Sequence, residues 1–169
     1  NKVTVIGLGP MGQSIAKAYL EKGYEVNLWN RTPSKADDLV KMGSTFYSSI
    51  LDAIKECELI IVSLTNYEIF YEVLNDATNS LKGKTFVNLS SGTPDEVRKA
   101  KVWTEQFGAN FISGGIMVPP PLVGKDDPNS YTFYSGNKAL FENYKGDLEV
   151  LSKVDYKGDD VGLAMLFYQ

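Results

Sequence analysis

Short apolar runs alternate with amphipathic stretches along most of the chain. The run at 58–64 is apolar through its centre, which is typical of a parallel strand buried on both faces. Helical stretches between such strands require crossover connections, so the pattern predicts a doubly wound α/β fold. We expect a mostly parallel sheet with helices on both faces and an antiparallel strand late in the chain. The expected strands are 3–6, 25–29, 58–64, 85–89, 110–112 and 131–134, and the expected helices are 14–20, 34–42, 49–56, 67–74, 97–107 and 139–151.

Two segments depart from this pattern. Residues 118–128 are rich in proline and cannot form a central strand, so we expect an ordered loop there. Residues 161–168 are apolar almost all round. A helix of that kind needs cover from a second domain or another subunit. The alternative is that it packs back on its own sheet.

Composition narrows the function classes. The chain has 169 residues, of which 43% are apolar and 22% charged, as in an ordinary folded domain. Its net charge of −4 and its lack of long basic runs argue against a nucleic-acid partner. Without histidine, and with Cys57 as its one cysteine, it lacks the usual zinc ligands and any Ser–His or Cys–His nucleophile pair. We expect no metal site, an unreactive Cys57 thiol in the core, and a cytoplasmic protein without a membrane span.

A glycine-rich turn carries the first functional signal. Gly7, Gly9 and Gly12 form G-x-G-x-x-G between the first expected strand and the first expected helix. In a Rossmann-type fold the first glycine permits a tight turn, the second lets the backbone approach a pyrophosphate, and the third lets helix and strand pack closely. Unpaired amides at the helix start also favour an anion. The alternative is a tight turn that binds no ligand.

The end of the second strand indicates which dinucleotide is bound. NAD-binding domains place Asp or Glu there to bind the ribose 2′-hydroxyl, and this chain has none. Asn30 can bond the ribose, while Arg31, Thr32 and Lys35 supply charge and donors suited to a 2′-phosphate. The site therefore predicts NADP(H) rather than NAD(H). The alternative is that Arg31 and Lys35 are solvated surface charges.

Polar residues also follow later strands, where open α/β sheets bind ligands. Leu64 and Thr65 follow the strand at 58–64, and Ser91 follows the strand at 85–89. Their amides and hydroxyls are candidates to border the cofactor, although a purely structural role suits Thr65 and Ser91 equally well. For Thr93, a helix cap is the favoured interpretation.

Four motifs together resemble the NADPH-binding domain of imine reductases, in the β-hydroxyacid dehydrogenase superfamily. They occur in order across the chain, and the last is the most specific. They are Gly7-Leu8-Gly9-Pro10-Met11-Gly12, Trp29-Asn30-Arg31-Thr32-Pro33 with Lys35, Leu89-Ser90-Ser91-Gly92-Thr93-Pro94, and Gly114-Gly115-Ile116-Met117-Val118-Pro119-Pro120. The resemblance implies an NADPH-dependent oxidoreductase that delivers hydride to the carbon of a C=N bond, and related members couple a ketone with an amine.

The resemblance also implies roles for particular residues. Leu8, Pro10 and Met11 would line the pyrophosphate turn, and Ser91 and Met117 would lie at the nicotinamide end. The family's proton donor, commonly Asp or Tyr, sits on a helical second domain, so no catalytic residue is assigned within this chain. We expect residues 1–158 to form the NADP-binding Rossmann domain and residues 159–169 to begin an interdomain helix leading to that domain. The resemblance further implies a homodimer formed through that second domain.

Two alternatives remain open. The first is an NADP-dependent β-hydroxyacid dehydrogenase acting on a carbonyl substrate, because Ser113-Gly114-Gly115 resembles the Ser-Gly-Gly substrate motif of that group. The triple proline that follows disfavours this alternative. Ser113 is in turn a departure from the imine reductase pattern, because those proteins often carry an acidic residue at this position. The second is an NADPH-binding module without catalysis.

Overall fold

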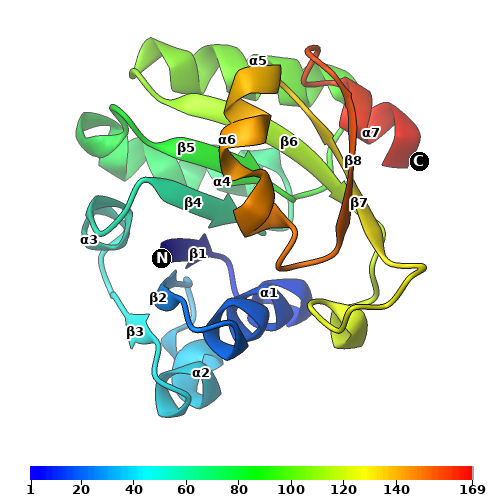
Figure 1. Cartoon of the computed structure of the whole chain (residues 1–169). Helices are drawn as coiled ribbons and strands as arrows, with labels where there is room; N and C mark the ends of the chain where they lie inside the picture. The colour runs from blue at the N-terminus through cyan, green and yellow to red at the C-terminus, as the bar shows by residue number, and fades with distance from the viewer. Residues whose placement is uncertain (169) are drawn as a thin grey trace.

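One eight-stranded sheet organises the computed structural model, which describes residues 1–168 (Figure 1). The strand order is β3-β2-β1-β4-β5-β6-β7-β8. In this spatial order, all neighbouring strands from β3 through β2 and β1 to β6 are parallel. Strand β7 is antiparallel to β6, and β8 is parallel to β7. This confirms the predicted mostly parallel sheet with a late antiparallel strand. The strands are β1 (Lys2–Ile6), β2 (Glu25–Trp29), β3 (Thr45–Phe46), β4 (Leu59–Val62), β5 (Thr85–Asn88), β6 (Asn110–Ile116), β7 (Tyr131–Ser135) and β8 (Lys153–Gly158).

Helices connect the strands, and several begin at a side chain that accepts a hydrogen bond from the first turn. Ser49, Asn66 and Asn137 cap three of them, and Thr93 forms a reciprocal capping box with Glu96. The cap predicted at Thr93 is thus confirmed. The helices are α1 (Pro10–Glu21), α2 (Asp37–Lys41), α3 (Ile50–Lys55), α4 (Tyr67–Leu74), α5 (Pro94–Gln106), α6 (Lys138–Leu148) and α7 (Leu163–Tyr168), with 3-10 turns η1 (Pro33–Ala36), η2 (Asn75–Ser80) and η3 (Pro120–Leu122).

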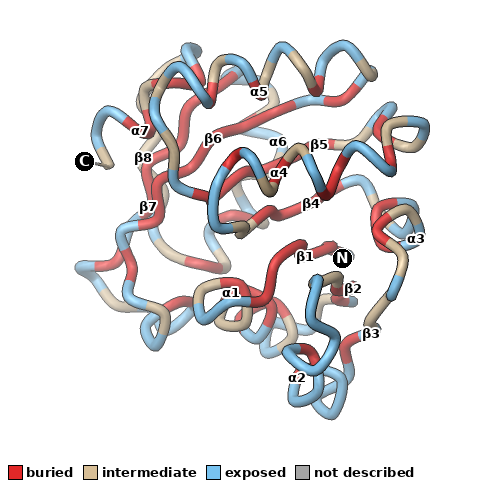
Figure 2. Tube along the Cα trace, turned by 180° about the vertical axis from the view of Figure 1, so that it is seen from behind, coloured by how far each residue is buried: buried red, intermediate tan, exposed pale blue. Residues whose placement is uncertain are grey.

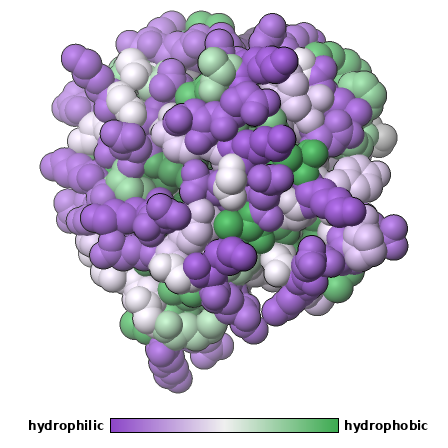
Figure 3. Space-filling model, in the orientation of Figure 1, coloured by the Kyte–Doolittle hydropathy of each residue, from purple (hydrophilic) through white to green (hydrophobic). Residues whose placement is uncertain are grey.

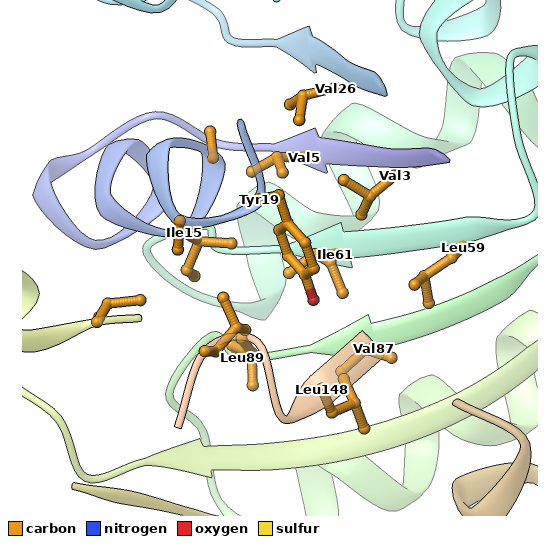
Figure 4. Packing of buried hydrophobic residues seen from close by; sticks show 14 of the residues in the cluster. Val3, Val5, Ile15, Tyr19, Val26, Leu59, Ile61, Val87, Leu89 and Leu148 are labelled. Carbon is orange, nitrogen blue, oxygen red and sulfur yellow. The ribbon is translucent and has the colours of Figure 1, made fainter. Parts of the chain in front are cut away.

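Two apolar layers hold the helices against the sheet, whose central strands are buried (Figure 2). On one face α1 and α6 pack over the strands, and α3, α4, α5 and α7 cover the other. Tyr19 of α1 lies beside Val5 and Ile61 in the first layer (Figure 4). Its hydroxyl donates to the Asp147 carbonyl of α6 at 3.0 Å, so a buried polar atom joins the two helices. The outer side of this layer is mainly hydrophilic (Figure 3).

The structure corrects the late part of the predicted pattern. Helix α6 ends at Leu148 instead of continuing to residue 151, and a turn at 149–152 leads into β8. Strand β6 runs through Gly114 to Ile116 rather than stopping at residue 112. A Cβ at Gly114 would lie 2.5 Å from Leu89 Cδ2 and 2.7 Å from Tyr134 Cε1, so this glycine allows close packing within the strand. The proline-rich segment is irregular apart from η3, as predicted.

The apolar C-terminal segment packs on its own sheet and leaves two large apolar side chains half exposed, of which Phe167 lies 5.8 Å from the Phe133 ring of β7. Val161, Ala164 and Met165 are buried against β6 and β7, whereas Leu166 and Phe167 are 54% and 50% exposed. The alternative of packing back therefore holds for the inner face. The outer face remains open to cover by another element.

A bidentate ion pair fastens this segment to α5. Arg98 donates from Nε and Nη2 to the two Asp160 carboxylate oxygens at 3.0 and 2.8 Å. The Arg98 hydrogen bonds hold the pKa of Asp160 below its ordinary value of 3.8. A carboxyl with a lowered pKa in the fold stabilises the fold above its ordinary pKa, and the contribution is lost as the pH falls through the lowered value.

We therefore expect Asp160→Asn to lower the thermal midpoint at neutral pH by an amount on the order of a few degrees, because the pair is partly exposed to solvent. The difference between variant and parent should shrink on acidification below pH 3.8. Scanning calorimetry at neutral pH and below pH 3.8 measures this difference in thermal midpoint. Asp95→Asn is the matched control, since Asp95 pairs with the same guanidinium from within α5. A difference that does not change with pH would contradict the assignment.

Candidate functional site

The glycine-rich turn joins β1 to α1 and depends on close backbone contacts. Gly7 has φ +98°, and a Cβ there would collide with the Ser63 carbonyl oxygen after β4. A Cβ at Gly12 would collide with the Gly7 carbonyl oxygen. By contrast, a Cβ at Gly9 would meet no atom within 4 Å. Gly7 and Gly12 therefore let β1, β4 and α1 approach closely, while Gly9 faces open space, as a backbone that contacts a pyrophosphate must.

A pocket of about 240 Å³ lies at this turn. It opens between the carboxyl ends of β1 and β4, where the strand order changes direction. Open α/β sheets bind ligands at such a switch point. The pocket is lined by Gly7, Leu8, Gly9, Pro10, Met11, Asn30, Ser63, Leu64 and Thr65. Eight of these nine residues are among those predicted from the sequence to bind the cofactor, and Ser63 is the exception.

The start of α1 suits an anion. Gly9 is the N-cap and offers no side-chain acceptor, and no acidic residue lies in the first turn. Pro10 has no N–H to satisfy, while the amides of Met11 and Gly12 have no carbonyl partner within the helix. A phosphate would accept from these amides and gain from the positive end of the helix dipole.

Asn30 braces the turn. Its Oδ1 accepts from the Leu8 amide at 2.9 Å, and its Nδ2 donates to the Thr32 carbonyl at 3.0 Å. The side chain thus ties the glycine turn to the end of β2. An amide suits the position because it supplies an acceptor and a donor on two separate atoms.

The basic residues after β2 are exposed beside the turn. Arg31 donates from Nη2 to Glu72 Oε2 of α4 at 3.2 Å. Thr32 is the N-cap of η1, and Lys35 lies in the last turn of η1. No carboxylate in residues 1–168 lies within ion-pair distance of Lys35. The end of β2 therefore presents two cations and no carboxylate of its own, and Glu72 comes from a distant part of the sequence.

A buried hydrogen-bond relay supports the far wall of the pocket. The side-chain oxygen Oδ1 of Asn88 accepts a hydrogen bond from the Ser90 amide at 2.9 Å. In turn, Ser90 Oγ accepts a hydrogen bond from the Leu64 amide at 2.8 Å. Asn88 and Ser90 are both buried. Ser90 thus fixes the position of Leu64 beside the exposed Thr65. This role of Ser90 was not predicted, because a serine next to Ser91 carries no distinguishing local signal in the sequence.

Ser91 and Met117 lie outside the pocket but at the same edge of the sheet. They follow the parallel strands β5 and β6, and both are exposed. The turn after Ser91 packs on α4, since a Cβ at Gly92 would lie 2.5 Å from Tyr67 Cε2. Met117 is held by its amide, which donates to the Tyr131 carbonyl at 3.0 Å. The structure therefore places Ser91 and Met117 further along the ligand-binding edge than the glycine turn.

A larger pocket of about 650 Å³ lies elsewhere, between the end of α1 and the segments 122–130 and 146–153. Glu21, Asp126, Asp127 and Glu149 line it together with two lysines. None of the residues predicted for the cofactor lines it. Its carboxylates would repel the phosphates of a nucleotide, so the smaller pocket is the better candidate for the nucleotide.

Cys57 is half-buried just before β4 and away from the glycine turn. Its Sγ lies 3.1 Å from Thr4 Oγ1, and burial raises the pKa of the thiol. A raised pKa lowers the thiolate fraction, which supports the interpretation of an unreactive thiol. Within residues 1–168 no cluster of carboxylate, cysteine or histidine side chains is arranged to hold a metal, and no helix is long and apolar enough to cross a membrane.

Comparison with known proteins identifies the family to which the chain is similar. Residues 2–155 match the NAD binding domain of 6-phosphogluconate dehydrogenase. An NADPH-dependent reductive aminase of Aspergillus oryzae is 39% identical over 165 residues, covering 97% of this chain and 55% of that protein. Glyoxylate/succinic semialdehyde reductase 1 of Arabidopsis thaliana is 29% identical, covering 95% and 56%. The structure of an imine reductase from Bacillus cereus BAG3X2 superposes with a TM-score of 0.96 at 52% identity, covering 99% of this chain and 58% of that one.

The chain thus spans a little over half the length of these relatives. The match runs through the glycine turn and every strand from β1 to β7, and it includes the first half of β8. The geometry of the glycine turn agrees with the match, because the closely packed Gly7 and Gly12 flank an open Gly9 at the switch point. The chain therefore belongs to the family of NAD-binding domains found in 6-phosphogluconate dehydrogenase, and its close homologues are imine reductases and reductive aminases.

Proposed function

We propose that the chain is the NADPH-binding part of an imine reductase. The observation that carries the proposal is the cradle at Gly9, open to a pyrophosphate, next to a β2 end that presents Arg31 and Lys35 instead of a carboxylate. The relatives named above as reductive aminase and imine reductase support the reaction type. Their names also support the cofactor, since the Aspergillus protein is NADPH-dependent.

Each predicted residue has a role in this proposal. Backbone amides at the start of α1 hold the pyrophosphate, Arg31, Thr32 and Lys35 hold the 2′-phosphate, and Asn30 keeps both turns in register. NADPH supplies the hydride for the C=N carbon, and the protein orients it and excludes water. In this proposal Leu64 and Thr65 border the cofactor beside the glycine turn, and Ser91 and Met117 lie at its nicotinamide end.

The chain spans a little over half the length of its named relatives, which leaves a second domain of those proteins unmatched. We propose that residues 159–169 begin the helix that leads to a second domain, and that the second domain provides the proton donor. The exposed Leu166 and Phe167 support this, because an apolar helix face is stabilised by a partner surface. A homodimer formed through that domain, and a cytoplasmic location, remain predictions.

We expect the 169-residue chain to bind NADPH without reducing imines. Hydride transfer needs the C=N carbon and a proton source held in place, and within residues 1–168 no Asp or Tyr lines the pocket. Nucleotide fluorescence measures binding, and absorbance of NADPH with a cyclic imine measures turnover. Steady oxidation of NADPH by the pure chain would show that the donor lies within residues 1–169.

A chimera tests the reaction type. The chain is joined to the part of the Bacillus cereus imine reductase that it does not cover. We expect this chimera to oxidise NADPH when a cyclic imine is present, because the two proteins share the fold of the part that is exchanged. A chimera that folds and binds NADPH without turnover would contradict the proposal. The carbonyl alternative, supported by the Arabidopsis relative, predicts that the protein reduces succinic semialdehyde in preference to imines.

A further inference from the structure

An ion pair joins the candidate 2′-phosphate site to a helix that the sequence analysis did not connect with it. Glu72 lies in the last turn of α4, and its Oε2 is 3.2 Å from Arg31 Nη2. The two residues are 41 positions apart in the sequence. Both side chains are partly exposed, at 62% for Arg31 and 52% for Glu72, so each can exchange partners. The acceptor that Arg31 uses in this structure is thus a carboxylate from another element.

A 2′-phosphate and this carboxylate need the same guanidinium. A phosphate monoester carries up to two negative charges near neutral pH and pairs with arginine in the same forked geometry as a carboxylate. When the phosphate binds, Arg31 must share its donors or leave Glu72, and Glu72 then stands as a like charge beside the ligand. NADH has no 2′-phosphate and does not disturb the pair.

We propose that Glu72 is a specificity-determining residue that limits the preference of this site for 2′-phosphorylated nucleotides. It acts through Arg31, by competition for the guanidinium and by repulsion of the phosphate. The proposal rests on the proposed function, because it assumes that the 2′-phosphate lies at Arg31. Lys35, which has no carboxylate partner in the described part of the chain, supplies attraction that Glu72 does not cancel.

The test is Glu72→Gln, which removes the charge and keeps the size of the side chain. Adenosine 2′,5′-bisphosphate and 5′-AMP serve as probes, since they differ only in the 2′-phosphate. Isothermal titration should show that the variant binds the bisphosphate about 2- to 10-fold more tightly at low ionic strength, with 5′-AMP unchanged. The gain should shrink at high salt, because both effects are electrostatic and solvent-exposed.

Two further variants make the result specific. Glu105→Gln breaks another exposed pair, Lys101 Nζ to Glu105 Oε1 at 2.9 Å, near the end of α5 just before β6 begins, and should change neither affinity. In an Arg31→Ala background, Glu72→Gln should gain less than in the parent, because part of its effect passes through Arg31.

The outcomes separate this inference from the proposed function. If Glu72→Gln changes neither affinity while Arg31→Ala still weakens the bisphosphate alone, the role of Glu72 is wrong and the 2′-phosphate site stands. If Glu72→Gln tightens both probes equally, its effect is a general one of charge, which also overturns the inference. If Arg31→Ala weakens both probes equally, the 2′-phosphate assignment fails, and the role of Glu72 fails with it.

Discussion

Replacing Arg31 with alanine is expected to weaken NADPH binding about 10- to 150-fold and to leave NADH binding little changed. A hydrogen bond to a charged group contributes about 1.5–3 kcal/mol, which corresponds to that range. The guanidinium lies at the end of β2, where it can face the 2′-phosphate, and its carboxylate partner in this structure, Glu72, comes from α4. The loss falls on one nucleotide because NADH lacks the group that Arg31 contacts.

Fluorescence titration of both nucleotides at one salt concentration measures this difference. Lys101→Ala is the matched control, since it removes an exposed cation from α5 and should leave both affinities unchanged. Equal losses of NADPH and NADH in Arg31→Ala would rule out the 2′-phosphate contact. They would indicate instead that Arg31 supports the fold of the turn.

Alanine at Gly9 and alanine at Gly12 are expected to fail in different ways. The Gly9→Ala methyl enters open space, so the fold should tolerate it, but it stands where the pyrophosphate must approach the backbone. We expect NADPH affinity to fall roughly 5- to 150-fold, the equivalent of about 1–3 kcal/mol of steric conflict. Gly12→Ala drives its methyl into the Gly7 carbonyl and should lower the thermal midpoint by about 2–12 °C.

Thermal melts and nucleotide titrations on the two variants separate these effects. Gly146→Ala is the control, because a Cβ there also meets no atom within 4 Å and lies on α6, away from the glycine turn. A Gly9→Ala variant that binds NADPH as well as the parent would show that the ligand does not use this turn. Loss of stability in Gly9→Ala equal to that in Gly12→Ala would contradict the geometry.

Local signals were sufficient for much of this structure. The strand at 25–29, the helix at 67–74 and the cap at Thr93 were predicted correctly, because alternation and capping chemistry depend on neighbouring residues. The glycine turn was predictable for the same reason. Strand β8 also carries a local signal, since Val154 and Tyr156 alternate with polar residues and pack on the core, and attention to that alternation would have found it.

Other features arise only from the tertiary fold. The pairing of Arg31 with Glu72 joins two elements that are distant in sequence, and exposed glutamates on a helix give no sign of a specific partner. Ser90 reaches Leu64 only because β4 and β5 are neighbours in the sheet. The glycines of β6 were read as a strand end, yet Gly114 is needed because Leu89 and Tyr134 pack against it.

The most direct measurement of the central claim compares NADPH with NADH on the unaltered chain. Isothermal titration of the 169-residue protein with each nucleotide, in the same buffer, isolates the contribution of the 2′-phosphate. A site that holds this phosphate with Arg31 and Lys35 should bind NADPH at least about 10-fold more tightly than NADH. Equal affinity for the two nucleotides, or no binding of either, would contradict it.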